Sequence, residues 1–574
     1  MIMLRRAFLT QASLSAVALT TGCGRPSPSV PGEGVPLVDA HCHVFNASDL
    51  PTTRFLRQVV FEDFPKQSVA RILAVRDPDV TDEFIALLLK LLGTGSAPTA
   101  DEEIAFLDTG RNGKAASLTV DKARAAAVED TSQHLLELDR KRRRIVTMTA
   151  PGDLATRSSI SEEKFLNYML GDPIKTLRAN EPLTIGEARG ASQRAFLRQD
   201  PVGRYLNWFS LFRLYRYVLV DRLVADSKAQ DFNPVLLTPA LVDYDEWLYE
   251  DVDFSPLPRQ MVVMDRISQR MAKAKSGPVV HGYMGFDPLR EVAFRKGKSS
   301  ISSLATAYSA LMKHGFVGIK LYPPMGFRPT GNQPPYPERT VKSLGFDPSE
   351  ELDAALRDLY KLCVDVDAPI LAHGYSSNGS GPDYAKRGDP AYWIPVFKEF
   401  PKLRVCIAHF GRFSARSAGR EGMLLPDGSW EWRLGEFIKE NPGRNVVADI
   451  SYFSEVLSAG SKERDFLAKS FNKWLEKFDS GCDHIVYGSD WIMLGKEAGY
   501  SHYIESVNAF LRTDCGLSDD TCDKIFRRNA LRFLPLERGS LGRERLLAYY
   551  RTNGLDEGRL PFASSRLVAR LFGR

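Results

Sequence analysis

Short apolar runs separated by amphipathic segments recur along the chain from about residue 233 onward. Each run is continuously apolar, which is typical of a parallel strand that is buried on both faces. Strands of this kind that alternate with helices predict an α/β fold. With one run near the N-terminus there are eight: LVDAHCHVF (37–45), PVLLTPALVDYD (234–245), GPVVHGYMGFDP (277–288), GFVGIKLYPP (315–324), APILAHGY (368–375), LRVCIAHFG (403–411), NVVADISYF (445–453) and HIVYGSDW (484–491).

The segments between the runs carry helical signals. In the stretch 347–366, Asp347 and Pro348 form a cap and first-turn pair, and Leu352, Leu356 and Leu359 fall on one side of the expected helix. Eight strands with helical crossovers predict a closed (β/α)8 TIM-like barrel.

The first crossover is much longer than the others. About 190 residues separate the first run from the second, and they include the helical stretches 82–92, 122–141 and 204–224. We interpret 46–233 as a mostly helical insertion over the barrel mouth, because insertions there need not disturb the barrel. The barrel itself would then comprise 37–45 and 234–536, followed by a basic C-terminal tail, 537–574.

The first 23 residues resemble an export signal. Arg5 and Arg6 precede a mildly apolar stretch, as in twin-arginine signals, and TTGC at 20–23 resembles a lipoprotein processing site with Cys23 as the lipidated residue. Residues 24–36 are rich in Pro, Gly and Ser and read as a tether. We therefore expect a periplasmic protein, or one anchored at the cell envelope.

Charge limits the partners. The net charge is +5, and it falls by two to +3 if Arg5 and Arg6 leave with the signal, which is too little to indicate nucleic acid. We expect a small-molecule substrate, and contact with a membrane only through a lipid anchor. The sequence leaves the oligomeric state open.

Chemistry-bearing side chains fall at the carboxyl ends of the predicted strands, which meet at one mouth of a barrel. These residues are His41 and His43 on the first strand, His373 on the fifth, His409 on the sixth and Asp490 on the eighth. The first two are two residues apart, so they point to the same face of the strand and can bind one ion. Imidazoles with a carboxylate suit a borderline divalent ion such as zinc, with one position open for water. These residues also have purely structural interpretations: His41 and His43 as a polar pair in a strand, His373 as a core histidine, and Asp490 as a helix cap.

In these motifs the chain resembles the amidohydrolase superfamily. The pattern is most similar to its amidohydrolase-related branch, which includes lactonases, other hydrolases and nonoxidative decarboxylases. The segment IFRRNALRFLPL (525–536) also resembles the helix that closes sequences of this family. The resemblance covers 37–44 and 234–536, and it rests on VDAHCHVF, GIKLYPP, APILAHGY, LRVCIAHFG, NVVADIS and VYGSDW.

The resemblance implies one divalent metal ion, with zinc favoured, held by His41, His43, His373 and Asp490. A divalent ion lowers the pKa of water and polarises a carbonyl. Asp490 would act as base and then acid, and His409 as a ligand, an electrophile or a proton-transfer partner. The expected enzyme is a hydrolase of an amide, lactone or ester bond. A nonoxidative decarboxylase of a small carboxylated compound is the alternative on the same fold, and a non-catalytic surface binding lipoprotein is the alternative from another class.

Further side chains of the same runs are candidates to line the pocket. The alternative roles for them are ordinary packing and surface salt bridges. Lys320 has three interpretations: a carboxylated bridge between two metal ions, a substrate contact, or a structural partner. We favour one metal, which leaves the last two. The other candidates are His281, Tyr283, Tyr322, Tyr375 and Arg412.

Overall fold

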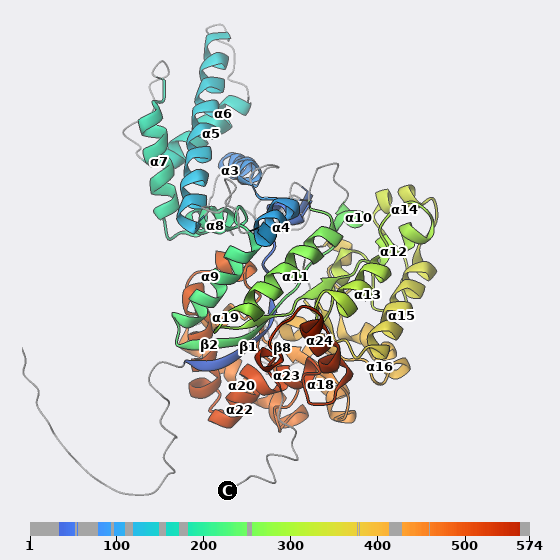
Figure 1. The fold of residues 1–574 in the computed structure, drawn as a ribbon. Helices are drawn as coiled ribbons and strands as arrows, with labels where there is room; N and C mark the ends of the chain where they lie inside the picture. Colours follow the sequence, from blue (N-terminus) through green and yellow to red (C-terminus); the bar gives the residue numbers. More distant parts are fainter. Residues whose placement is uncertain are drawn as a thin grey trace, which may run out of the picture.

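The computed structural model of the protein shows an α/β fold in which helices surround short parallel strands (Figure 1). The α/β class predicted from the sequence is therefore confirmed. Residues 1–33 lie outside the described part, so the predicted signal, Cys23 and most of the predicted tether stay predictions. The structure describes residues 34–51, 54–55, 78–92, 97–109, 119–148, 157–171, 182–248, 255–375, 377, 379–411, 427–458 and 460–562.

The strands form two sheets in which all neighbours are parallel. Every predicted apolar run overlaps a strand, and the third run contains two. The strands are almost wholly buried, as their continuous apolar sequences require. The first sheet has the order β1 (Val35–Cys42), β2 (Phe232–Pro239), β3 (Val279–Val280), and the second has the order β4 (Tyr283–Gly285), β5 (Gly318–Leu321), β6 (Ile370–Ala372), β7 (Val405–Ile407), β8 (Val446–Asp449), β9 (Ile485–Val486).

Backbone hydrogen bonds connect the two sheets on both sides. After β2, Ala240 forms a parallel bridge with Tyr283 of β4, and Leu241 N donates to Tyr283 O over 2.9 Å. On the other side, Ala40 N of β1 donates to Tyr487 O over 3.1 Å, directly after β9. No ladder between β9 and β1 is present in the described residues, so the expected closed barrel is not seen as one continuous sheet. The strands of the second sheet are only two to four residues long, and β9 has only two, which leaves individual hydrogen bonds to β1 in place of a ladder.

Helices follow the strands throughout the second half of the chain. Several carry a buried apolar face toward the strands, as α11 does with Met261, Met264 and Ile267. The helices are α10 (Asp245–Leu248), α11 (Leu257–Lys273), α12 (Pro288–Arg295), α13 (Ser303–Lys313), α14 (Glu338–Leu344), α15 (Ser349–Asp365), α16 (Trp393–Glu399), α18 (Trp430–Glu440), α19 (Glu455–Ser458), α20 (Ser461–Phe478), α21 (Tyr503–Ala509), α22 (Asp519–Asp523), α23 (Asn529–Phe533) and α24 (Leu541–Thr552).

The boundary of one predicted helix differs from the structure. We expected Asp347 as the cap and Pro348 as the first helical residue, but α15 begins at Ser349, with Pro348 in the cap position. The carboxylate of Asp347 still accepts a hydrogen bond from Ser349 N over 3.0 Å. The helix therefore starts one residue late, because a proline offers no N–H for that bond.

The region between β1 and β2 contains helices and no strand in its described parts. Figure 1 shows α5, α6 and α7 projecting away from the strands, whereas α8 and α9 lie nearer to them. The predicted helical stretch 204–224 is divided between α8 and α9, because Tyr215 between them has extended backbone. The helices are α3 (Pro78–Leu91), α4 (Ala100–Thr109), α5 (Val120–Met148), α6 (Arg157–Leu170), α7 (Ile185–Leu197), α8 (Pro201–Leu211) and α9 (Arg216–Lys228).

The described part of the predicted basic tail packs against the strands. Leu546 and Tyr550 of α24 share an apolar cluster with Val38 of β1 and Cys406 of β7. This contact covers the interior of the sheets at one end. None of the helices that the structure describes is long and apolar enough to span a bilayer.

Candidate metal centre

The side chains singled out from the strand ends converge at one edge of the sheets. His41 and His43 come from β1 and the residue after it. His373 directly follows β6, His409 is two residues after β7, and Asp490 is four residues after β9. The ring centroids of His41 lie 5.3 Å from those of His43 and 5.1 Å from those of His409, and His409 lies 4.7 Å from His373. Asp490 Oδ1 is 3.1 Å from His43 Nε2. The structure therefore brings together His41, His43, His373, His409 and Asp490.

The backbone at this edge adopts an unusual conformation. His409, Phe410, Tyr452 and Asp490 all have φ between 48° and 58°. Non-glycine residues rarely occupy this left-handed region, and each such residue costs on the order of 1–3 kcal/mol. Strain concentrated at the ends of three neighbouring strands indicates a constraint that packing alone does not explain.

Close approach of β1 to the segment before Asp490 requires a glycine. A Cβ on Gly488 would lie 2.7 Å from His41 Cβ, which is too short for any side chain. Asp39 reinforces this contact, because its carboxylate accepts hydrogen bonds from Ser489 N (3.0 Å) and Ser489 Oγ (2.6 Å). Asp39 thus positions β1 against the loop that carries Asp490.

Hydrogen bonds fix the tautomers of the first two histidines. His43 Nδ1 is 2.9 Å from Ala240 O, and because a carbonyl oxygen can only accept, Nδ1 carries the proton. His41 Nδ1 is 2.9 Å from Asp449 Oδ2, so it donates there in the same way. The Nε2 atoms of both rings therefore present lone pairs, as in metal-ligating histidines whose other nitrogen is held by an acceptor.

These lone pairs face a carboxylate. Asp490 Oδ1 lies 3.1 Å from His43 Nε2 and 3.4 Å from His41 Nε2. The ligand atoms of the three residues all lie within 4.8 Å of one another. Three electron-pair donors this close repel one another unless a cation lies among them, so the donor set fits a divalent metal. Lys320 supplies positive charge beside it, with Nζ 3.0 Å from His41 Nε2.

The electrostatics of the site suit metal ligation. Burial, and then the charge of Lys320, lower the pKa of His41 to about 3. Burial, and then the charge of His409, hold the pKa of His373 well below its ordinary value. Burial opposes ionisation of Asp490, but its contacts with His43 and His41 outweigh this and hold the pKa of Asp490 below its ordinary value. Near pH 7 the site thus offers neutral imidazoles and an ionised carboxylate. Burial also lowers the pKa of Lys320 to about 8.

His373 belongs to the cluster but has other partners for both ring nitrogens. Its Nε2 is 2.8 Å from Ser377 Oγ, and its Nδ1 is 3.2 Å from His409 Nε2. Tyr322 stacks on it at 4.2 Å between centroids, and its hydroxyl is 3.0 Å from Ser377 Oγ. The two groups of mutually close ligand atoms among the described residues are His41, His43 and Asp490, and His41, His409 and Asp449. The ligand role of His373 stays a prediction.

Some of the predicted pocket-lining residues lie at this site and others lie elsewhere in the molecule. The Tyr375 ring lies 6.1 Å from the His409 ring, and buried Tyr283 lies below, in the interior of the sheets. Our expectation that His281 lines the pocket is wrong: its Nδ1 is 2.8 Å from Gly315 O, and its Nε2 is 3.1 Å from the hydroxyl of Tyr550 in α24. His281 lies between β3 and β4, and its side chain points toward α24 of the tail. Arg412 lies outside the described residues.

Two residues of the centre were missed in the sequence. Asp449, the last residue of β8, contacts His41, and it also accepts a hydrogen bond from His409 N over 2.8 Å. Ser451 Oγ lies 3.0 Å from His41 Nδ1 and 2.9 Å from His409 Nδ1. Asp449 stands at a strand end in NVVADISYF, so the rule that found Asp490 also applies to it.

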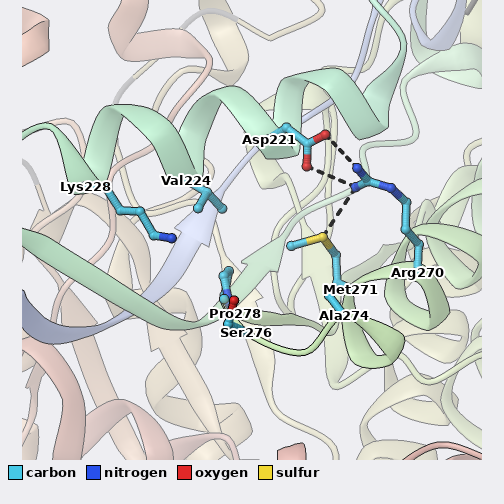
Figure 2. A pocket seen from close by; sticks show the side chains of 9 residues that line it. Asp221, Val224, Lys228, Arg270, Met271, Ala274, Ser276 and Pro278 are labelled. Atoms are coloured by element: carbon cyan, nitrogen blue, oxygen red, sulfur yellow. Dashed lines mark hydrogen bonds and ion pairs between the residues drawn. The ribbon is translucent and has the colours of Figure 1, made fainter. Parts of the chain in front are cut away.

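A surface pocket of about 270 Å³ lies apart from this centre. Figure 2 shows it between α9 and α11, where Arg270 of α11 and Asp221 of α9 form an ion pair of 2.8 Å. Its other lining residues include Gly277 and Pro278, which directly precede β3. The pocket is therefore at the amino end of the strands, whereas the histidine cluster is at the carboxyl end.

Comparison with known proteins found a family match and several solved structures of low sequence identity. No curated protein matched the chain. It is similar to solved structures of a Burkholderia multivorans amidohydrolase with bound zinc (13% identity, 57% of this chain and 90% of that chain, TM-score 0.35) and a Rhodopseudomonas palustris 4-oxalomesaconate hydratase (16%, 59% and 84%, 0.32). It is also similar to a 2,6-dihydroxybenzoate decarboxylase (16%, 55% and 88%, 0.31). Scores this low establish neither the fold nor the activity of this chain.

The sequence match has a firmer basis. Residues 302–536 match the model of the amidohydrolase family, and they include β5 to β9 with His373, His409, Asp449 and Asp490. Over residues 302–536, the chain is therefore similar in sequence to the amidohydrolase family.

Proposed function

We propose that residues 37–45 and 234–536 form one (β/α)8 barrel whose mouth carries the metal centre. The bridge between Ala240 and Tyr283 and the hydrogen bond from Ala40 N to Tyr487 O support closure, because they connect the two sheets on both sides. Residues 46–233 would be a helical insertion after the first strand, and 537–574 a tail packed on the barrel.

We propose that His41, His43 and Asp490 hold one divalent metal ion, with zinc favoured by the nitrogen-rich donor set. When bound, such an ion supplies Lewis acidity, which lowers the pKa of water and polarises a carbonyl. His373 would complete the ligand set by exchanging its contact with Ser377 for the ion. His409, whose Nδ1 is close to Ser451, would donate a hydrogen bond to a developing oxyanion or serve as a ligand.

The proposed reaction is hydrolysis of an amide, lactone or ester bond. The observation that carries it is the ionised carboxylate of Asp490 beside two imidazoles that present lone pairs. Asp490 would take the proton from water and pass it to the leaving group, which is general base and then general acid catalysis. Lys320, with its ammonium 3.0 Å from His41 Nε2, would stabilise negative charge that develops beside it.

Metal analysis combined with a substrate screen tests this function. We expect about one equivalent of zinc or another divalent ion per purified chain, and base consumption at constant pH with members of a lactone, ester and amide panel. Asp490→Asn should lose bound metal and lower turnover by roughly 100-fold or more, since it removes both a ligand and the base. Asp479→Asn is the control, because Asp479 makes a similar carboxylate contact with His484 outside the centre, at 3.0 Å.

The alternative functions predict different outcomes in the same experiment. Release of carbon dioxide from carboxylated substrates, without hydrolysis, would indicate a nonoxidative decarboxylase. Two metal equivalents would indicate that a carboxylated Lys320 bridges two ions. Substrate binding that survives Asp490→Asn, with no turnover by either protein, would contradict the enzyme proposal.

A further inference from the structure

Lys496 lies close to the metal centre but has no part in the proposed metal ligation. It ends the short helical turn η7 (Met493–Lys496), which follows directly from the Asp490 loop, and Leu494 N donates to Asp490 O over 3.2 Å. The side chain is partly buried.

Two aromatic rings from distant segments hold the Lys496 ammonium. Its Nζ lies 5.3 Å from the ring centroid of Trp208 in α8 and 5.4 Å from that of Tyr452. Tyr452 directly follows Ser451, whose hydroxyl contacts His41 and His409. The ammonium is therefore held beside the edge that carries the proposed metal centre by cation–π contacts.

The position of Trp208 is itself fixed. Its Nε1 donates to Ile492 O over 2.7 Å, and a Cβ on Gly495 would lie 3.0 Å from its ring, so glycine there permits the contact. Arg204 of the same helix donates to Lys496 O over 3.2 Å. Helix α8, from the region between β1 and β2, thus contributes one wall around Lys496.

The charged groups near Lys496 leave its ammonium available to bind an anion. Among the described residues no carboxylate lies within ion-pair distance of its Nζ, and the acids nearest in effect are Glu497 and Asp490. Glu497 accepts a hydrogen bond from the Tyr452 hydroxyl, and Asp490 belongs to the metal centre. A cation that aromatic rings orient and no acid neutralises fits the recognition of an anion.

Resting on the proposed hydrolase function, we propose that Lys496 binds a carboxylate of the substrate, so that the enzyme selects anionic over neutral substrates. The proposal names carboxylate-bearing lactones, esters or amides as the substrate class. It also gives helix α8 a role, because Trp208 places the cation that makes the selection.

Binding of a non-reacting pair of probes tests the proposal without turnover. Glutarate has one carboxylate for the metal and one for Lys496, whereas its monoamide, glutaramate, keeps one carboxylate for the metal and offers Lys496 a neutral amide. In calorimetric titrations of the zinc-loaded full chain, we expect glutarate to bind roughly tenfold or more tightly than glutaramate, as expected for a hydrogen bond to a charged group. Lys496→Met should remove most of this preference, and Lys496→Arg should keep part of it.

Lys477→Met provides a matched control. The Lys477 ammonium also lies over two rings, 4.7 Å from Trp432 and 5.6 Å from Phe478, but on the outer helix α20. This variant should keep the wild-type preference for glutarate. An unchanged preference in Lys496→Met, or no measurable glutarate binding to the metal-loaded wild type, would overturn the proposal.

Turnover separates this proposal from the hydrolase function. The γ-lactone 5-oxotetrahydrofuran-2-carboxylate and its 2-carboxamide differ only in charge. We expect Lys496→Met to raise KM for the carboxylate roughly tenfold and to leave KM for the carboxamide unchanged. Anion-selective binding without any hydrolysis would contradict the hydrolase function alone. Hydrolysis of both lactones with equal KM would contradict the role of Lys496 alone.

Discussion

His41 is the residue on which most contacts of the metal centre depend. One ring nitrogen is held by Asp449 and Ser451, and the other faces Asp490 and Lys320. The ring therefore joins a supporting acceptor to the proposed ion. Partners of this kind orient a metal-ligating imidazole and raise its basicity.

Removal of the charge on Asp449 tests that support. Asp449 accepts from His41 Nδ1 with Oδ2 and from His409 N and Ser451 N with Oδ1. In Asp449→Asn one of these oxygens becomes an NH2 group, which cannot accept, so the side chain no longer holds the His41 ring and the two backbone N–H groups together. We expect zinc affinity to fall roughly 10- to 100-fold, as is typical for such partners, measured by competition with a chromogenic chelator. Asp479→Asn should bind zinc as the wild type does. Equal affinity in Asp449→Asn and wild type would show that Asp449 does not support the ligand.

The residues of the centre differ in how far the sequence could predict them. His41, His43 and Asp490 could be predicted, because strand ends are recognisable and the fold brings them to one edge. Asp449 obeys the same rule and could have been included. Ser377 and Lys496 could not, because they lie on irregular segments whose paths depend on tertiary contacts such as that between Trp208 and Ile492.

Among the elements, α24 contacts a residue that the sequence analysis placed at the other end of the strands. His281 was expected at the mouth, yet it lies against Tyr550 of this helix at the other end of the strands. The apolar runs predicted where strands occur, but a run alone does not tell which of its residues face the mouth. The short strands β3 and β4 interrupt the run on either side of His281, so strand periodicity could not place it.

This contact makes stability depend on pH. Burial lowers the pKa of His281 from 6.5 to about 4, so the fold favours the neutral ring. The resulting stabilisation is present above pH 6.5 and is lost as the pH falls toward 4. From this group alone we expect the free energy of unfolding to be about 2 kcal/mol lower at pH 5 than at pH 7. Chemical denaturation at both pH values measures the difference.

His281→Asn should reduce that pH difference by the same amount, because asparagine does not titrate. Its absolute stability does not enter the comparison. His502→Asn is the matched substitution at an exposed histidine. If His281→Asn and wild type lose equal stability between pH 7 and pH 5, the ring does not titrate as inferred.

At the scale of the whole molecule, the metal centre joins the two ends of the strand order. His41 and Asp490 are about 450 residues apart in the chain, and Asp490 N donates to His41 O over 2.8 Å. The sequence predicts that the strands exist and in what order. It does not predict how completely the first meets the last, because that depends on the few hydrogen bonds between β1 and the segment after β9.

Metal removal should therefore weaken the whole fold. A ligand that binds only the folded state adds about 2.7 kcal/mol to stability when its free concentration is 100 times its Kd. We expect dialysis against a chelator to lower the unfolding midpoint, and zinc to restore it in proportion to the logarithm of its concentration. In Asp490→Asn the midpoint should be the same with and without zinc, because the ion has lost the carboxylate that connects the last strand to the first. A zinc-dependent midpoint in that variant would place the ion elsewhere in the molecule.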